Sequence, residues 1–185
     1  MSTLRKAFAY SKKKVVPYTR TSKKKQKSYI KMIPPQKIVK FTMGNPQAFN
    51  AGKFQHVLSV VSTENVQIRH NALEACRQYI NKKMDTDLAG QYYFRVKPFP
   101  HHIQRENKML MGAGADRMQT GMQLSFGKNV GKAAIVKPGS EIFVIYVQTP
   151  KAIAIARNAI KEVKPKLPGK VSILYKDLSR KAPAI

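Results

Sequence analysis

The residues whose types could do chemistry gather in one segment, residues 101–131. Two adjacent histidines, His101 and His102, open the segment, and two acids, Glu106 and Asp116, lie within it. The acids form no pair with a catalytic context, and no Ser/His/Asp or Cys/His arrangement is present. In an extended chain the two histidines would point to opposite sides, and they have no third ligand nearby. The sequence therefore predicts no metal site and no cofactor.

The same segment is rich in glycine and basic residues. It holds five of the ten glycines and four of the eight methionines of the chain. Gly112 and Gly114 lack the spacing of a dinucleotide loop, and no Gly-Lys-Ser/Thr follows them. Glycine lets a backbone approach a ligand closely, and side chains such as Arg105 and Lys108 suit phosphate. The composition therefore predicts contact with a phosphate backbone.

The charge of the chain points to the same kind of partner. Among 185 residues there are 35 Lys and Arg against 9 Asp and Glu, which gives a formal net charge of +26. A small domain stays soluble with a net charge of about 2–8, so this excess indicates a polyanion. No acid precedes Glu64, and Tyr10, Tyr18 and Tyr29 are interleaved with the basic clusters before it. We expect this segment to bind nucleic acid, although a solubilising tail, or a tail that orders only on RNA, fits the same pattern.

Several other classes of protein are disfavoured. The single Cys76 excludes a disulfide scaffold, and its place on an apolar helical face predicts a buried thiol. Prolines interrupt the basic segment at Pro17, Pro34 and Pro35, which argues against an amphipathic membrane-binding helix. Because there is neither a signal-peptide pattern nor a run of 18 apolar residues, we expect a cytoplasmic protein with no membrane partner.

Hydrophobic periodicity predicts the elements that position these residues. Strands are expected over 54–61, 91–97, 133–136, 142–147 and 171–175, the third and fourth pairing as a hairpin around a Pro-Gly turn. Helices are expected over 64–84, with Ser62 or Thr63 as N-cap, and from Pro150 to Pro165, with Thr149 as N-cap.

These elements predict an α+β fold: a single domain with a mostly antiparallel sheet and two helices. We divide the chain into a basic extended N-terminal segment over residues 1–50, a globular domain over 51–178 and a short tail over 179–185. Residues 98–131 are expected to form one long loop inside the domain. Loops of this length are uncommon in compact domains unless they are functional or disordered.

Three strings of the chain resemble a known family. They are KPFPHHIQRENKM at 97–109, GADRMQTGM at 114–122 and FGK at 126–128. They are similar to the L-sixteen family of large-subunit ribosomal proteins, in its archaeal and eukaryotic branch, often called "L ten e". Pro17-Tyr18 and the segment 37–41 also resemble the N-terminal region of that family, so that the resemblance runs from Tyr10 to Tyr175. The N-terminal region lacks the cysteines of eukaryotic members, which favours the archaeal branch.

The resemblance implies an α/β-hammerhead type of fold and a structural role in the large ribosomal subunit. It implies binding to large-subunit ribosomal RNA beside the aminoacyl-tRNA site and the peptidyl-transferase centre, with neighbouring ribosomal proteins as further partners. It also implies that the long loop reaches toward the acceptor ends of tRNA, and that the chain is not an enzyme and takes no small-molecule substrate. The alternative is a free-standing nucleic-acid-modifying enzyme with residues 101–131 as its active site.

Two groups of residues are predicted to make these contacts. The predicted ribosomal-RNA-binding residues are basic: Lys12, Lys13, Lys14, Arg20, Lys23, Lys24, Lys25, Lys27, Arg95, Lys97, Arg117, Lys128 and Lys132. The predicted tRNA-proximal residues lie in the loop: His101, His102, Gln104, Arg105, Lys108, Met109, Met111 and Gly112.

Overall fold

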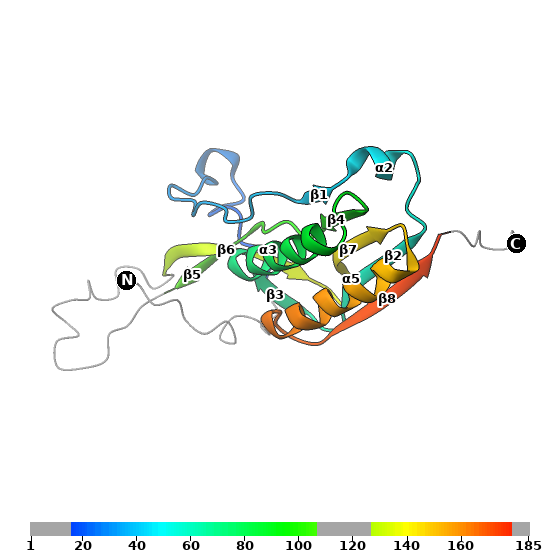
Figure 1. Cartoon of the computed structure of the whole chain (residues 1–185). Helices are drawn as coiled ribbons and strands as arrows, with labels where there is room; N and C mark the ends of the chain where they lie inside the picture. Colours follow the sequence, from blue (N-terminus) through cyan, green and yellow to red (C-terminus); the bar gives the residue numbers. More distant parts are fainter. Residues whose placement is uncertain (1–15, 107–126, 179–185) are drawn as a thin grey trace, which may run out of the picture.

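Two antiparallel sheets form the framework of the molecule (Figure 1). The computed structural model describes residues 16–106 and 127–178. The five-stranded sheet has the order β1-β4-β7-β2-β8, and the three-stranded sheet has the order β3-β6-β5. The strands are β1 Thr42–Gly44, β2 His56–Ser62, β3 Val66–Arg69, β4 Tyr92–Val96, β5 His102–Glu106, β6 Lys128–Val136, β7 Glu141–Val147 and β8 Val171–Asp177. The predicted α+β class is confirmed, with two sheets where one was expected; the hammerhead type stays a prediction.

Two long helices lie side by side on one face of the five-stranded sheet (Figure 1). They are α3 His70–Asp87 and α5 Pro150–Val163, and the shorter helices are η1 Lys25–Lys27, α2 Pro46–Asn50 and η3 Lys164–Lys166. Fully buried side chains such as Phe94 and Phe143 of the sheet and Ile80 of α3 form the core between these layers. Burying side chains of this size stabilises the fold by about 1.5–3 kcal/mol each.

Helix α5 begins as its sequence predicts. Thr149 is the N-cap, its side chain accepts a hydrogen bond from the Ala152 N–H at 3.4 Å, and Pro150 occupies the first turn. This threonine satisfies one backbone donor that the helix itself leaves unpaired, and proline needs no such partner. The buried face includes Ala152, Ala156 and Ile160, as the spacing predicts.

The predicted start of the first long helix is wrong. The helix was expected from residue 64, but β3 occupies Val66–Arg69 and pairs with β6, so that α3 begins at His70. Ile68 fits both patterns, because it lies four positions before Ala72, as in a helix, and two positions after Val66, as in a strand. Pairing with β6 stabilises residues 66–69 as a strand. Helix α3 follows directly, with Arg69 at the N-cap position and no side-chain hydrogen bond to cap it.

The predicted hairpin of residues 133–136 and 142–147 is also wrong. Strand β6 pairs with β3 and β5, whereas β7 pairs with β2 and β4 in the other sheet. The turn at Pro138-Gly139 exists, and Gly139 has a φ of 81°, which favours glycine. Its N–H donates to the carbonyl of Ser62 at 2.8 Å, so the turn leads the chain from one sheet to the other.

The segment 98–131 is not a loop throughout. Its first part forms β5 and its last part begins β6, and the two strands pair from His102↔Ala133 to Glu106↔Lys128. The sequence shows no hydrophobic alternation at β5, because the buried positions of this strand are mostly polar. His102, Gln104 and Glu106 alternate with Ile103 and Arg105. Hydrophobic periodicity cannot detect such a strand.

The basic N-terminal segment is anchored to the domain where the structure describes it. Ile30 and Ile38 are buried, and Met43 of β1 packs into the core beneath α3. Strand β1 pairs with β4 and forms an edge of the five-stranded sheet. At Ile38 and at β1, the N-terminal segment therefore packs against the globular part.

Cys76 is fully buried in the core, as its place on the helical face predicts. Burial raises the pKa of its thiol to about 12, because the apolar surroundings disfavour the thiolate. Cys76 is therefore a small core side chain and not a nucleophile. Within the described residues, no helix is long and apolar enough to cross a membrane.

Candidate nucleic-acid interface

The N-terminal segment lies along the free edge of β5. The Tyr18 N–H donates to Nδ1 of His102 at 2.9 Å, and the Ile103 N–H donates to the Tyr18 carbonyl at 2.9 Å. The guanidinium of Arg105 lies over the Tyr18 ring, 3.9 Å from its centroid. These contacts join residues more than eighty positions apart and fix the N-terminal segment to the β5–β6 pair.

The next residues form a closed loop that carries most of the described N-terminal lysines. We call residues 21–28 the lysine loop. The Thr21 N–H donates to the Ser28 carbonyl at 3.0 Å, and the Thr21 hydroxyl donates to the Lys27 carbonyl at 2.8 Å. The Ser28 hydroxyl donates to the Lys25 carbonyl at 2.8 Å, next to the single turn η1. The loop is closed by its own hydrogen bonds, so its lysines are presented from a defined backbone.

The structure places the predicted ribosomal-RNA-binding residues in three groups. Those with exposed side chains are Arg20, Lys23, Lys24, Lys25, Lys27, Arg95, Lys97 and Lys128. Lys132 in β6 is half-buried. Lys12, Lys13, Lys14 and Arg117 lie outside the described residues, as do Lys108, Met109, Met111 and Gly112 of the predicted tRNA-proximal loop. Of the lysine loop, Lys27 lines one hollow together with Arg105 and Lys128.

Lys97 already has a partner within the chain. Its ammonium lies 2.5 Å from a carboxylate oxygen of Glu141, whose other oxygen accepts from the Ser59 hydroxyl at 2.9 Å. The hydrogen bond from Lys97 holds the pKa of Glu141 below its ordinary value. A phosphate would have to compete with Glu141 for Lys97. Arg95, two residues earlier in β4, also has an exposed side chain.

The two histidines of the predicted loop have opposite environments. His101 is exposed, and its ring centroid lies 4.5 Å from that of Phe99. His102 is buried in β5, where burial and the nearby Arg105 lower the pKa of its imidazole, so that it stays neutral and accepts from Tyr18. His102 is thus occupied inside the protein, contrary to its expected place in an exposed loop.

Gln104 is likewise buried and paired. Its side-chain amide donates to the side-chain Oε1 of Gln67 in β3 at 3.2 Å. Of the predicted tRNA-proximal residues in β5, only Arg105 keeps a half-buried side chain toward the hollow. A buried amide pair was not visible in the sequence, because glutamine usually indicates a surface position.

Gly131 serves packing. A Cβ at this position would lie 3.3 Å from Nε2 of His70, so the glycine makes room for that ring. Burial, followed by the positive charges of Lys37, Lys132 and Arg69, lowers the pKa of His70. His70 was not among the predicted functional residues. The only sequence feature that marks it is its position directly before the apolar face of α3. Across residues 16–106 and 127–178, no three His, Cys, Asp or Glu side chains could together hold a metal ion.

Comparison with known proteins identifies the family. The family model described as "Ribosomal protein L16p/L10e" matches residues 17–174. The chain belongs to the L16p/L10e family of ribosomal proteins. Its relatives include the "Large ribosomal subunit protein uL16" of Hyperthermus butylicus, with 46% identity over 82% of this chain and 79% of that one. The protein of the same name from Staphylothermus marinus is 40% identical over 95% of each chain, and that of Sulfolobus acidocaldarius is 41% identical over 98% of each.

Membership of the L16p/L10e family decides between the two functions left open by the sequence. Members are structural components of the ribosome, so the chain is not an enzyme. The alternative placed an active site in residues 101–131, and the geometry of its described part agrees with a structural role. Glu106 is buried and His102 accepts a hydrogen bond from the backbone. Asp116 lies outside the described residues.

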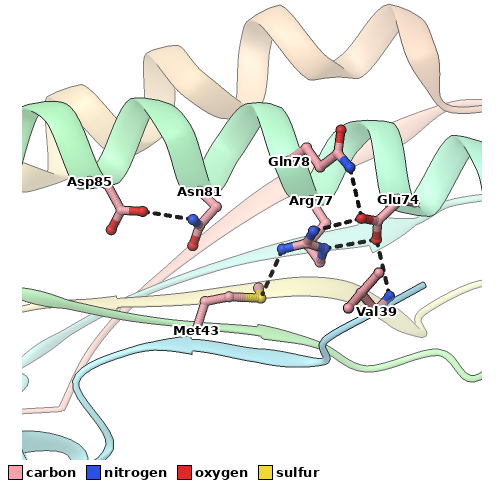
Figure 2. A network of polar contacts seen from close by, with 7 residues as sticks. All are labelled: Val39, Met43, Glu74, Arg77, Gln78, Asn81 and Asp85. Carbon is pink, nitrogen blue, oxygen red and sulfur yellow. Dashed lines mark hydrogen bonds and ion pairs between the residues drawn. The ribbon is translucent and has the colours of Figure 1, made fainter. Parts of the chain in front are cut away.

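A polar network fixes the N-terminal segment of this L16p/L10e protein to α3 (Figure 2). The Glu74 carboxylate accepts from Arg77 at 2.6 and 2.8 Å, from Gln78 at 3.0 Å and from the Val39 N–H at 3.4 Å. Arg77 also reaches the sulfur of Met43 at 3.7 Å. The hydrogen bonds from Arg77 are the main cause that lowers the pKa of Glu74. This network holds residues 39–43 in place against α3. Toward the N-terminus, the chain runs from these residues to the lysine loop.

Proposed function

We propose that this chain is a structural component of the large ribosomal subunit that binds the RNA of that subunit near the aminoacyl-tRNA site and the peptidyl-transferase centre. The observation that carries the proposal is the family match over residues 17–174, together with relatives named as large-subunit proteins along most of the chain. In this role the protein is bound to ribosomes in the cytoplasm, next to other ribosomal proteins. It positions RNA and performs no chemistry itself.

The contacts of the N-terminal segment support an electrostatic mode of RNA binding. Lysine and arginine side chains gain affinity by releasing the counterions of a phosphate backbone. The lysine loop presents four exposed lysines, and Tyr18 holds its base against β5. Because its own hydrogen bonds close the lysine loop, we expect less conformational entropy to be lost when the loop binds RNA.

The finer part of the proposal concerns tRNA. The resemblance implies that residues 101–112 approach the acceptor ends of bound tRNA. In the structure, residues 102–106 belong to β5, so we assign this role to the segment between β5 and β6. Deleting residues 103–111 would remove part of a paired strand. Replacing residues 107–126 by a short Gly-Ser linker is the appropriate variant, because it leaves both strands intact.

Sedimentation of tagged full-length protein in cell extracts tests the assignment to the large subunit. We expect co-sedimentation with the large subunit at moderate salt. Free RNA binding should weaken by roughly 10³–10⁵-fold between 50 and 200 mM salt if six to ten phosphates are engaged. A protein that sediments only as a free chain, or whose RNA affinity does not change with salt, would contradict the proposal.

A pair of charge-matched variants tests the lysine loop. One replaces Lys23, Lys24, Lys25 and Lys27 with alanine, and the other replaces the exposed Lys151, Arg157, Lys161 and Lys164 of α5 and η3. Both lose four positive charges, so a general electrostatic effect is the same in each. Only the first is expected to reduce the slope of log affinity against log salt by about 0.7–0.9 for each lost phosphate contact. The linker variant should bind large-subunit RNA as the unaltered protein does but support tRNA-dependent steps poorly.

A further inference from the structure

A large open hollow lies between the N-terminal segment and the end of the β5–β6 pair at which Arg105 pairs with Asn129. Its volume is about 790 Å³. One wall is made of Gln26 and Lys27 of the lysine loop and of residues 29–32, and the other wall is made of Arg105 and residues 127–129 at the start of β6. Hollows of about 300–1,000 Å³ are the size that binds small organic groups.

Two large side chains in this hollow are left in water. Tyr29 is 67% exposed and Met32 is 74% exposed, although Ile30 between them is buried. Ile30 is buried, whereas the nearby side chains of Tyr29 and Met32 face outward. Apolar side chains gathered at a concave surface indicate a binding site more strongly than scattered ones do.

The charges around Tyr29 and Met32 identify the partner's chemistry. Lys27, Lys31 and Lys128 line the same hollow, and each is exposed. An aromatic ring among lysines suits a nucleotide, because the base stacks on the ring while the ammonium groups hold phosphates. A basic protein segment would be repelled here, and in a chain of net charge +26 the surroundings add to that repulsion.

Hydrogen bonds and a ring contact within the chain hold the walls of the hollow together. The side-chain amide of Asn129 donates to the Met32 carbonyl at 2.6 Å, which ties the N-terminal wall to β6. Arg105 of β5 lies over the Tyr18 ring of the N-terminal segment. The hydrogen bonds of Thr21 close the lysine loop before Tyr29. The Tyr29 ring is thus carried by a backbone segment that is fastened on both sides.

We propose that this hollow binds an unstacked base of single-stranded RNA, which stacks on Tyr29 and packs against Met32 while Lys27, Lys31 and Lys128 hold the neighbouring phosphates. The inference rests on the proposed function as an RNA-binding ribosomal protein, and it adds a base-binding subsite to it. Exposed bases in loops and bulges are the features of RNA that aromatic side chains recognise. The subsite would therefore fix the N-terminal segment to an unpaired nucleotide.

The test compares two oligonucleotides that differ only in their bases. The full-length protein is titrated with fluorescent ten-nucleotide RNA, once as oligouridylate and once as an abasic strand with the same phosphates, at one fixed salt concentration. We expect Tyr29→Ala to weaken binding of oligouridylate by roughly 5- to 150-fold, which is the value of one base–aromatic stack. Binding of the abasic strand should stay within twofold. Lys31→Ala should weaken both strands equally.

Two matched variants separate stacking from other effects. Tyr29→Phe keeps the ring and should bind oligouridylate like the unaltered protein. Tyr175→Ala removes another exposed tyrosine, on the edge strand β8, and should change neither affinity. Thermal unfolding of each variant checks that the fold is retained.

Several outcomes would overturn the inference. Equal binding of both strands by the unaltered protein would do so, as would an equal effect of Tyr29→Ala on both strands or no effect on either. If Tyr29→Ala loses association with ribosomal proteins while its RNA affinity is unchanged, the hollow binds a protein partner instead of a base. If these results occur while the chain still binds large-subunit RNA, the base-binding subsite fails alone. If the chain binds no large-subunit RNA at all, the proposed function fails with it.

Discussion

The guanidinium of Arg105 lies 3.9 Å from the centroid of the Tyr18 ring, and this contact connects the N-terminal segment with β5. We predict that Tyr18→Ala lowers the free energy of unfolding by about 1–2 kcal/mol, since it removes the cation–π contact and apolar area. Tyr18→Phe keeps the ring and should cost less than about 0.5 kcal/mol. Urea denaturation measures both values. Hydrogen exchange should become faster over residues 18–32 in Tyr18→Ala only, and unchanged exchange would contradict the role of this contact.

A second prediction concerns the pH dependence of stability. Burial and Arg105 lower the pKa of His102 in the folded state, below the value of 6.5 in the unfolded chain. Below pH 6.5 the unfolded chain therefore binds more protons, and the folded state loses stability as the pH falls. His102→Asn provides an acceptor near the position of Nδ1 but does not titrate, so stability should fall less steeply between about pH 6.5 and 5.

The remaining slope of that variant has a source in the structure. The pKa of His70 is lowered for similar reasons, so its effect on stability has the same sign. Thermal unfolding of the unaltered chain and of His102→Asn over a pH series measures both slopes. An identical slope for His102→Asn and the unaltered chain would contradict the hydrogen bond from Tyr18 to a neutral His102.

The Glu74 network predicts a large cost for removing one charge. In Glu74→Gln the guanidinium of Arg77, whose side chain is 12% exposed, loses its carboxylate. We expect the free energy of unfolding to fall by about 3 kcal/mol, because an uncompensated charge remains in a largely buried position. Lys97→Ala breaks a more exposed ion pair and should cost about 1 kcal/mol or less. Equal costs for the two variants, measured by urea denaturation, would show that burial does not distinguish these pairs.

Gly44 gives a prediction from backbone geometry. Its φ is +92°, and a Cβ there would lie 2.3 Å from the Tyr92 carbonyl oxygen of the paired strand. Gly44→Ala should cost about 3 kcal/mol, because β1 must move away from β4 or change conformation. Gly52 also has a positive φ, of 68°, but open space around it, so Gly52→Ala should cost only about 1–2 kcal/mol. Thermal or urea unfolding of the two variants separates the steric cost from the conformational one.

The sequence predicted those elements whose local signals agree with their packing. Thr149 and Pro150 mark the start of α5, and Tyr92, Phe94 and Val96 alternate in β4. The sequence failed where tertiary pairing decides. Val66 and Ile68 form a strand only because β6 lies beside them, and the turn at Gly139 joins two sheets that no local pattern distinguishes.

The candidate interface was predictable in its charge but not in its geometry. Clustered lysines identify a polyanionic partner at once. The contact of Tyr18 with β5 depends on a backbone pairing across more than eighty residues, and β5 itself has polar buried positions such as His102 and Gln104. A residue like Tyr29 becomes informative only when the structure places it in a hollow beside Lys128.

Ultraviolet crosslinking of intact large subunits, followed by mass spectrometry of the peptides that carry nucleotides, tests the central claim most directly. The claim is that this chain binds large-subunit RNA through its N-terminal segment and the β5–β6 pair. We predict crosslinked peptides from residues 18–32 and from the region of Arg105 and Lys128, each attached to large-subunit RNA. Crosslinks confined to the outer faces of α3 and α5, or the absence of any crosslink between this chain and large-subunit RNA, would contradict the claim.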